Sequence, residues 1–476
     1  MRVAAAFLAL LAIACSGAAR RGGTVILASG ADLQSANPLL TTHPLARQVQ
    51  RYALLVTLVR YDSTLAPVPY LARSWEWSSE RTRLTFRLYR GLHWHDGTPT
   101  TAHDVGWTLQ AAREPATGYP RRNDLGDLTD LEVLDDTTLV LRFVRPQARI
   151  PDVLTDLAIL PRHGFDGVPL SELRRAPWNQ RPIGNGPFRF VSHEPNRRWV
   201  FEANPTFPAE LGGAPRLHRF VIAVVDEPTT KLAALTSGEL DFAGINPAHA
   251  DFVRRDPALH VLSYPVLFSY ALVFNTRRPP FDRLEARRAV AAAIDRQAIV
   301  DGVLFGFGTP ATGPVPPDLL SLAPGSASGD RPQTGPLAGA PAQSFELLTV
   351  GSGEAALEQM MQAQLAKVGV RADLRQLELS TFLDRVQGPT HDFDAAVLGV
   401  SGDLMLGYLA QVVELAGLRP EGGSRQLVRL IGDSTPATFL YHAKGVQGMN
   451  RRVRGVHMDV RGELVTLSQW SVADAR

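Results

Sequence analysis

Residues 345–374 read FELLTVGSGEAALEQMMQAQLAKVGVRADL. The first six residues are largely apolar, as in a buried strand, and apolar side chains then recur at helical spacing from Leu357 to Val368. Gly369 is placed to end this helix, because glycine adopts the left-handed backbone of a C-cap without strain. The residues from Val370 to Leu374 alternate between apolar and polar, which indicates a second strand. This order predicts a parallel sheet flanked by helices.

The same pattern extends outward from this stretch. A short helix is predicted from Thr381 to Val386 and a further strand from Phe393 to Val400, which completes a βαβαβ order. A long helix is predicted from Leu284 to Leu304, while Gly313 to Gln343 is rich in Pro, Gly, Ala and Ser and is predicted to be a long loop. The first half is strand-rich with scattered helices. We therefore expect an α/β protein.

The composition is that of an ordinary globular protein. Of its 476 residues 45% are hydrophobic and 20% charged, which excludes disorder of the whole chain. Lys plus Arg number 49 and Asp plus Glu 47, so the net charge of +2 gives no electrostatic case for nucleic acid. The single cysteine excludes an internal disulfide and a cysteine-based metal site. The phosphate-binding loop, the zinc-protease motif and the serine-hydrolase elbow are missing from the sequence, which excludes those families but not catalysis in general.

The first residues are typical of an export signal. Arg2 is followed by twelve apolar residues, Val3 to Ala14, which are too few to span a bilayer as a helix. Leu11 to Cys15 is similar to a bacterial lipoprotein signal, in which the cysteine becomes the acylated first residue. The alternative is an ordinary cleaved signal with Cys15 incidental. We expect residues 1–14 to be a signal peptide, residues 15–23 to be a tether, and the body to lie on the periplasmic side, lipid-anchored to a membrane.

Two histidines are the strongest metal candidates. His93 and His95 alternate, and alternating residues of a strand share one face, where two ligands could converge. The alternative is a strand that ends at the Asp96-Gly97 turn, with structural histidines. We favour the structural interpretation and expect neither a metal site nor a cofactor.

Several motifs occur in a fixed order along the chain. They are Val68–Glu76, Leu84–Leu88 with Gly91–Gly97, Gly184–Phe188, Lys231–Asp241, and Phe274–Asp282 with its continuation to Arg296. Together they resemble the bacterial extracytoplasmic solute-binding proteins of family 5, the peptide/nickel class, which deliver a ligand to an ABC importer. The resemblance runs from about residue 24 to 310 and more loosely to 470.

The resemblance implies the two-lobe periplasmic-binding-protein fold (type II, peptide class), with an extra subdomain in the first lobe. Crossover strands at Tyr264–Phe274 and near Phe439–His442 would act as the pivot when the lobes close over a ligand. The implied boundaries are 24–42, 181–263 and 439–476 for lobe I, 43–180 for its subdomain and 264–438 for lobe II.

The ligand site carries over from the family in part. Peptide binders commonly hold the ligand ammonium with an aspartate that follows a Gly-Trp pair, and Asp403 fits that aspartate although Val400 replaces the tryptophan. The alternative is a solvated loop aspartate. A peptide backbone could also add to strand edges near Ser29 and Gly399. The expected ligand-binding residues are Asp403, Gly399, Ser401, Ser29, Phe268 and Tyr270.

Two departures mark the second lobe. The loop from Gly313 to Gln343 stands where the family has a helix, and little room is left for helices between Glu414 and Leu430. The expected function is still a lipid-anchored, monomeric solute-binding protein that captures peptides or similar small solutes, with ABC permease subunits as partners and no enzyme activity. Binding of nickel or a metal chelate, a sensor or scaffold lipoprotein with a degenerate site, and an extracellular hydrolase remain as alternatives.

Overall fold

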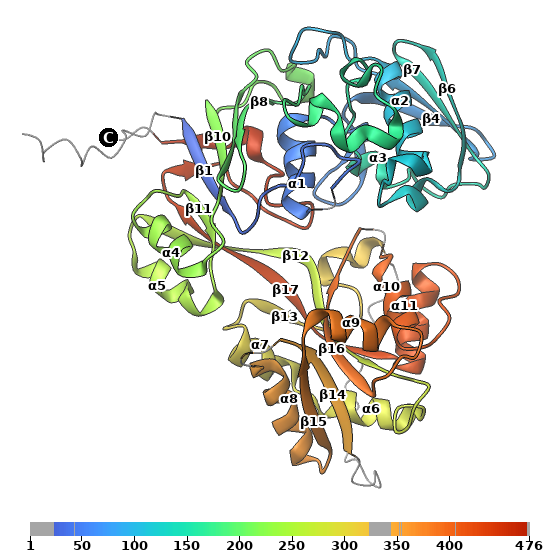
Figure 1. The fold of residues 1–476 in the computed structure, drawn as a ribbon, viewed down its shortest axis with the longest axis vertical. Coiled ribbons are helices and arrows are strands. Elements are labelled where there is room, and N and C mark those ends of the chain that lie inside the picture. Colours follow the sequence, from blue (N-terminus) through green and yellow to red (C-terminus); the bar gives the residue numbers. More distant parts are fainter. Residues whose placement is uncertain are drawn as a thin grey trace, which may run out of the picture.

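The chain forms two lobes joined by two long antiparallel strands, β12 (Leu259–Phe274) and β17 (Ala437–Asn450) (Figure 1). The computed structural model describes residues 23–41, 43–322, 344–351, 353, 355–404 and 406–473. Both long strands belong to one 11-stranded sheet in the order β15-β14-β16-β12-β17-β11-β1-β10-β9-β8, with β13 paired to β17. The pairing of β12 with β17 shifts register between Pro265 and Ser269. The sheet therefore continues from one lobe to the other, with an irregularity at the crossing.

The first lobe is assembled from distant parts of the chain. Its elements are β1 (Thr24–Ser29), α1 (Pro44–Val49), the π-helix η1 (Gln50–Leu54), β8 (Phe188–Glu194), β9 (Arg198–Ala203), η7 (Ala209–Leu211), β10 (Arg219–Val224), α4 (Pro228–Thr236), β11 (Phe242–Gly244), η8 (Pro247–His249), α5 (Ala250–Arg255), β18 (Val453–Arg454), η10 (Leu467–Gln469) and β19 (Ser471–Val472). β1 pairs with β10 in parallel over its whole length. A buried ion pair fastens this arrangement, because Arg452 donates to both carboxylate oxygens of Asp241 and to the carbonyl of Thr24.

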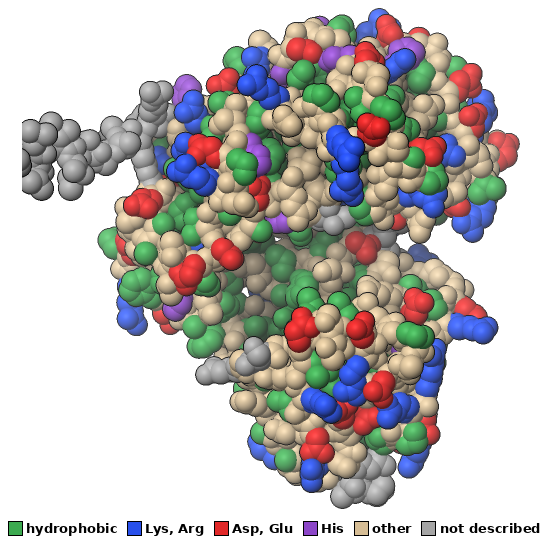
Figure 2. Space-filling model, viewed as in Figure 1, with side chains coloured by type: hydrophobic (Ala, Val, Ile, Leu, Met, Phe, Trp, Pro, Cys, Tyr) green, Lys and Arg blue, Asp and Glu red, His purple; other side chains and the backbone are tan. Residues whose placement is uncertain are grey.

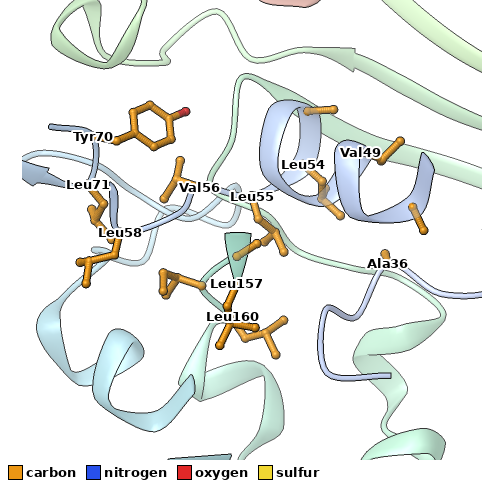
Figure 3. Close-up of a cluster of buried hydrophobic side chains, with 14 of the residues drawn as sticks. Ala36, Val49, Leu54, Leu55, Val56, Leu58, Tyr70, Leu71, Leu157 and Leu160 are labelled. Carbon is orange, nitrogen blue, oxygen red and sulfur yellow. The ribbon is translucent and has the colours of Figure 1, made fainter. Parts of the chain in front are cut away.

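A subdomain with its own small sheet is inserted into this lobe. The sheet has the order β4-β5-β7-β6 and is separate from the large one. Its elements are β2 (Val59–Tyr61), β3 (Pro67–Pro69), β4 (Ala72–Trp77), β5 (Arg83–Leu88), α2 (Ala102–Arg113), η2 (Pro115–Thr117), η3 (Arg122–Leu125), β6 (Leu128–Asp135), β7 (Thr138–Phe143), α3 (Val153–Asp156), η4 (Arg162–Phe165), η5 (Leu170–Arg175) and η6 (Pro177–Asn179). Figure 3 shows how Leu54 and Leu55 lie in one apolar cluster with Leu157 and Leu160.

The motif Gly184-Asn185-Gly186 closes the subdomain against η1. A Cβ at Gly184 would lie 2.0 Å from the carbonyl oxygen of Leu54, and one at Gly186 would lie 2.4 Å from that of Ala53. Asn185 is fully buried, and its side-chain oxygen accepts from the backbone N–H of Val56. Glycine is required at both positions because backbone approaches backbone there.

Gly184→Ala is expected to lower the free energy of unfolding by about 1–3 kcal/mol, because the added methyl group would displace the η1 backbone. Urea unfolding of the purified body measures this. Gly244→Ala is the matched control, since a Cβ at Gly244 meets nothing within 4 Å. Equal stability of the two variants would contradict the close-approach argument.

The second lobe confirms the βαβαβ prediction. Its elements are α6 (Leu284–Ala293), α7 (Arg296–Val303), β13 (Gly308–Pro310), η9 (Pro317–Leu322), β14 (Ser344–Val350), α8 (Ala356–Lys367), β15 (Arg371–Leu377), α9 (Leu379–Gln387), β16 (Ala395–Ser401), α10 (Tyr408–Leu415) and α11 (Ser424–Ser434). β14 pairs in parallel with both β15 and β16. Helices α9 to α11 pack in one apolar cluster and α6 to α8 in another, on opposite faces of the sheet (Figure 1).

One expectation for this lobe needs correction. The predicted helix from Leu284 to Leu304 is two helices, because Asp295 starts a new one: its carboxylate caps α7 by accepting from the backbone N–H of Ala298 at 2.9 Å. The segment between Glu414 and Leu430, where little room for helices was expected, holds only the end of α10 and the first part of α11. Of the predicted loop, residues 323–343 lie outside the described residues, as do the predicted signal peptide and Cys15. Within the described part, no helix is both long and apolar enough to cross a bilayer.

Candidate functional site

The surface is hollowed between the two lobes, where β12 and β17 cross from one to the other (Figures 1 and 2). Four of the predicted ligand residues lie together on the second-lobe part of β12 and on its neighbour β16. Phe268 and Tyr270 of β12 stand opposite Ser401 and Gly399 of β16 in the strand register. We take this region as the candidate site.

The side chains of Phe268 and Tyr270 form an aromatic surface, which is called the aromatic ledge below. The rings of Phe268 and Tyr270 meet edge to face with centroids 5.5 Å apart, and Tyr270 stacks on Tyr441 of β17 at 5.0 Å. The Phe268 ring covers Gly399, where a Cβ would lie 2.3 Å from it. Both rings of β12 are half-buried. The glycine therefore makes room for the ring, and an apolar surface results.

The edge of β16 at this ledge is only partly paired. On its second side β16 pairs with β14 at Ala395 and Ala396, and among the described residues no further partner follows on that side. Gly399 lies beyond these two pairs. That a peptide strand adds to this edge stays a prediction.

Asp403 lies outside the strands that carry the aromatic ledge. It follows β16 in the loop before α10, and its carboxylate accepts from the backbone N–H of Gly407 at 3.1 Å. Its charge contributes to raising the pKa of Asp152 in the subdomain, for which burial is the main cause. Asp403 therefore lies close enough to the subdomain for its charge to act on Asp152.

Ser29 is used locally. It ends β1 in the first lobe, and its hydroxyl donates to the carbonyl of Ala31 at 2.6 Å. Among the described residues, no hydrogen bond connects the Ser29 side chain to the second-lobe site residues. Its predicted ligand role stays a prediction.

A cluster that the sequence analysis missed lies at the first-lobe end of the crossing. The Tyr264 hydroxyl donates to Oε1 of Glu463 at 2.7 Å, and Nε2 of Gln447 lies 3.4 Å from the same hydroxyl. Burial raises the pKa of Glu463, against the hydrogen bonds from Tyr264 and Gln447. Tyr264 lay in the aromatic stretch predicted to cross between the lobes, but no local pattern pointed to Glu463.

Apolar contacts also join the two lobes. Leu65, in the turn between β2 and β3, is only 6% exposed and lies in the second-lobe cluster that includes Leu406 and Leu409. Tyr61 and Val460 pack against the same cluster. The two lobes are therefore in contact with each other beside β12 and β17.

A buried histidine lies at the crossing itself. His442 of β17 shares a 2.8 Å hydrogen bond with the hydroxyl of Ser269 on β12. Burial lowers the pKa of His442 to about 4, because the charged imidazole is poorly solvated there. The folded protein therefore holds this histidine neutral.

We expect the free energy of unfolding to fall as the pH decreases from about 6.5 to about 4, by at most about 3 kcal/mol from His442. Between these pH values the imidazole of His442 binds a proton in the unfolded chain but not in the folded protein. Above about pH 6.5 it is neutral in both states, and its contribution to the free energy of unfolding is fully present. Urea unfolding near pH 7 and near pH 4.5 measures the difference. His442→Gln should make the free energy of unfolding less dependent on pH. Part of the pH dependence should remain, because the pKa of His95 is lowered in a similar way. An unchanged dependence in the variant would contradict the assignment.

The two candidate metal-binding histidines have structural contacts. A ring nitrogen of His93 lies 3.0 Å from the carbonyl of Gly91, and one of His95 lies 3.0 Å from that of Gly186. In the part of the chain that the structure describes, no group of three or more potential metal ligands comes together.

Comparison with known proteins identifies the family. The model for bacterial extracellular solute-binding proteins, family 5, matches residues 66–408, which is more than half of the chain. The chain belongs to this family. A relative in Brucella ovis, named a putative ABC transporter peptide-binding protein, is 31% identical over 256 residues, which are 53% of this chain and 48% of the relative. The chain thus matches about half the length of such curated relatives.

Solved structures show the same fold. The oligopeptide-binding protein AppA from Bacillus subtilis, in complex with a nonapeptide, aligns with a TM-score of 0.72 at 21% identity, over 95% of this family 5 chain and 99% of AppA. NikZ from Campylobacter jejuni, in complex with Ni(L-His), aligns with a TM-score of 0.72 at 18% identity, over 94% and 99%. The predicted two-lobe periplasmic-binding-protein fold with its extra subdomain is confirmed.

Proposed function

We propose that this family 5 protein is a lipid-anchored solute-binding protein that captures peptides between its lobes and delivers them to an ABC importer. The observation that carries the proposal is the hollow crossed by β12 and β17, with an aromatic ledge and an incompletely paired strand edge on its second-lobe side. Family membership supports capture without bond breaking, and the named activity of the peptide-binding relatives supports the ligand class.

Hinged closure is the proposed mechanism. Two strands carry the sheet between the lobes, and their register shifts between Pro265 and Ser269, so bending there disturbs few ladder hydrogen bonds. A ligand that contacts both lobes binds the closed form more tightly and shifts the population toward it. In this proposal lobe I comprises 24–42, 181–263 and 439–476, its subdomain 43–180, and lobe II 264–438.

The ligand class is tested first by native mass spectrometry of the protein extracted from membranes and purified as a monomer. Short peptides of varied sequence, released on gentle activation, are the expected result. A nickel complex would favour the metal-chelate alternative. An empty protein whose unfolding temperature is unchanged by peptides and by Ni²⁺ would favour the sensor or scaffold alternative. In membrane extracts, an acylated N-terminus at Cys15 is expected, and an unmodified one would contradict the anchor.

Asp403→Asn is expected to weaken binding of trialanine about tenfold but to leave binding of N-acetyl-trialanine unchanged, because only the free amine offers a cation to the carboxylate. Isothermal titration of both peptides measures this. Asn keeps an oxygen for the Gly407 N–H, so the loop is preserved. An equal loss for both peptides would contradict an ammonium-binding role.

A further inference from the structure

The cluster of Tyr264, Gln447 and Glu463 stands at the boundary between the lobes. Gln447 of β17 pairs with Gly244 of the first-lobe strand β11, whereas Ala443, four residues earlier, pairs with Gly308 of the second-lobe strand β13. Tyr264 lies opposite Gly445, between these two pairs.

The tyrosine reaches its partner across a glycine. A Cβ at Gly445 would lie 2.3 Å from the Tyr264 ring, so the phenol crosses β17 at a position that has no side chain. The backbone beside Glu463 is fixed as well, because Leu464 is fully buried and its N–H donates to Oε1 of Gln48 on α1 at 3.0 Å. Glu463 itself is half-buried. Its carboxylate is therefore held at a defined place beside the crossing.

The hydrogen bonds of this cluster leave acceptors in excess. The single proton of the Tyr264 hydroxyl goes to Glu463, so the hydroxyl can only accept from Gln447, which turns Nε2 toward it. The Gln447 oxygen is then left without a donor, although the side chain is only 6% exposed. A buried oxygen without a donor is costly unless a ligand or water supplies one.

Glu463 also differs from three other carboxylates of the first lobe that are buried or half-buried. Asp241, Asp156 and Asp459 each form an ion pair with arginine. Among the described residues no basic side chain forms an ion pair with Glu463. Arg461, two residues away, is directed to Asp459 and to the carbonyl of Tyr61. The Glu463 carboxylate and the Gln447 amide oxygen can together accept hydrogen bonds from one ligand group. A group with several N–H donors and a positive charge is complementary to both.

We propose that Glu463, with Tyr264 and Gln447, binds the basic side chain of a captured peptide and gives the protein a preference for lysine-containing ligands. The inference rests on the proposed capture of peptides between the lobes. It assigns a second cation site, on the first lobe, apart from the predicted ammonium site at Asp403 on the second. Closure would exclude water from the pair and so strengthen its charge-assisted hydrogen bonds.

The probes are three tripeptides, Lys-Ala-Ala, Ala-Lys-Ala and Ala-Ala-Lys, each with a counterpart in which norleucine replaces lysine. Norleucine keeps the apolar stem and removes the ammonium. For at least one position we expect the wild-type protein to bind the lysine peptide about tenfold more tightly than its counterpart, as measured by isothermal titration. E463Q should abolish this preference while binding the norleucine peptide as the wild type does.

The variants separate this proposal from its alternatives. E463Q keeps an acceptor for the Tyr264 hydroxyl and should retain the wild-type unfolding temperature, and Tyr264→Phe should weaken the preference in part. Glu421→Gln, at an exposed carboxylate, is the matched control and should keep it. A wild-type protein that binds tripeptides without a lysine preference, or an E463Q variant that retains one, would overturn this inference alone. A wild-type protein that binds none of the tripeptides would overturn the peptide function and the inference with it.

Discussion

Replacing Arg452 by methionine should lower the free energy of unfolding by about 3–5 kcal/mol, because the change leaves the buried carboxylate of Asp241 without its counter-ion. Asp241 is 0% exposed, and its carboxylate accepts from Arg452 at 2.7 and 2.8 Å and from the backbone N–H of Ile26 at 2.9 Å. Arg452 also donates to the carbonyl of Thr24 at 2.7 Å. The pair thus joins β1, the start of β11 and the segment after β17. Urea unfolding monitored by tryptophan fluorescence measures the loss.

The control for Arg452→Met is Arg278→Met. Arg278 pairs with Asp392 at 2.8 Å, but both side chains are about half exposed, so that pair contributes at most about 1 kcal/mol. The double variant Asp241→Leu, Arg452→Met should recover part of the loss, because it removes the buried charge as well as its partner. If Arg452→Met were no more destabilising than Arg278→Met, the buried pair would not fasten the first lobe.

Leu65→Ala should open the protein. Burial of a leucine side chain contributes about 2 kcal/mol or more relative to alanine, and Leu65 is buried against the opposite lobe, so the loss falls on the closed arrangement. We expect the radius of gyration of the ligand-free protein to increase. The affinity for trialanine should fall on the order of thirtyfold, because a smaller fraction of the protein is competent to bind. Small-angle scattering and isothermal titration measure the two effects.

The turn that carries Leu65 makes this test specific. Asp62 accepts from the N–H groups of Thr64 and Ala66, and Leu65 itself has a φ of +63°, so the turn is held in shape without the leucine side chain. Leu65→Met keeps the apolar volume and should behave as the wild type. A Leu65→Ala variant with lower thermal stability but unchanged scattering and affinity would show that the contact does not control closure.

The parts of the fold that the sequence predicted are those whose signal is local. The strands and helix between Phe345 and Leu374 follow from side-chain periodicity, and the structure places them within a few residues of the prediction. The break between α6 and α7 was missed because apolar spacing continues through Asp295, although an aspartate is a good N-cap. At this point the N-cap formed by Asp295 determines the helix boundary, and the apolar spacing does not.

The candidate site was predicted in part for the same reason. Phe268 and Tyr270 share a strand with Tyr264, so alternation alone places them on the crossing. Glu463 could not be found in this way, because its partner Tyr264 lies 199 residues earlier in the chain. The requirement for glycine at Gly184 and Gly445 is likewise set by what approaches them from distant segments, Leu54 in one case and Tyr264 in the other.

The hydrogen bond between Arg452 and the carbonyl of Thr24 also limits the order in which the two lobes can complete their folding. A chain that emerges from its N-terminus presents β1 first, yet β1 waits for β10, for β11 and finally for the segment that carries Arg452. The second lobe lies between β11 and the segment that carries Arg452, and it has all of its strands before Arg452 arrives. The lobe that begins first is therefore completed last, and the free edge of its β11 stays unpaired until β17 arrives, when the chain is almost fully released.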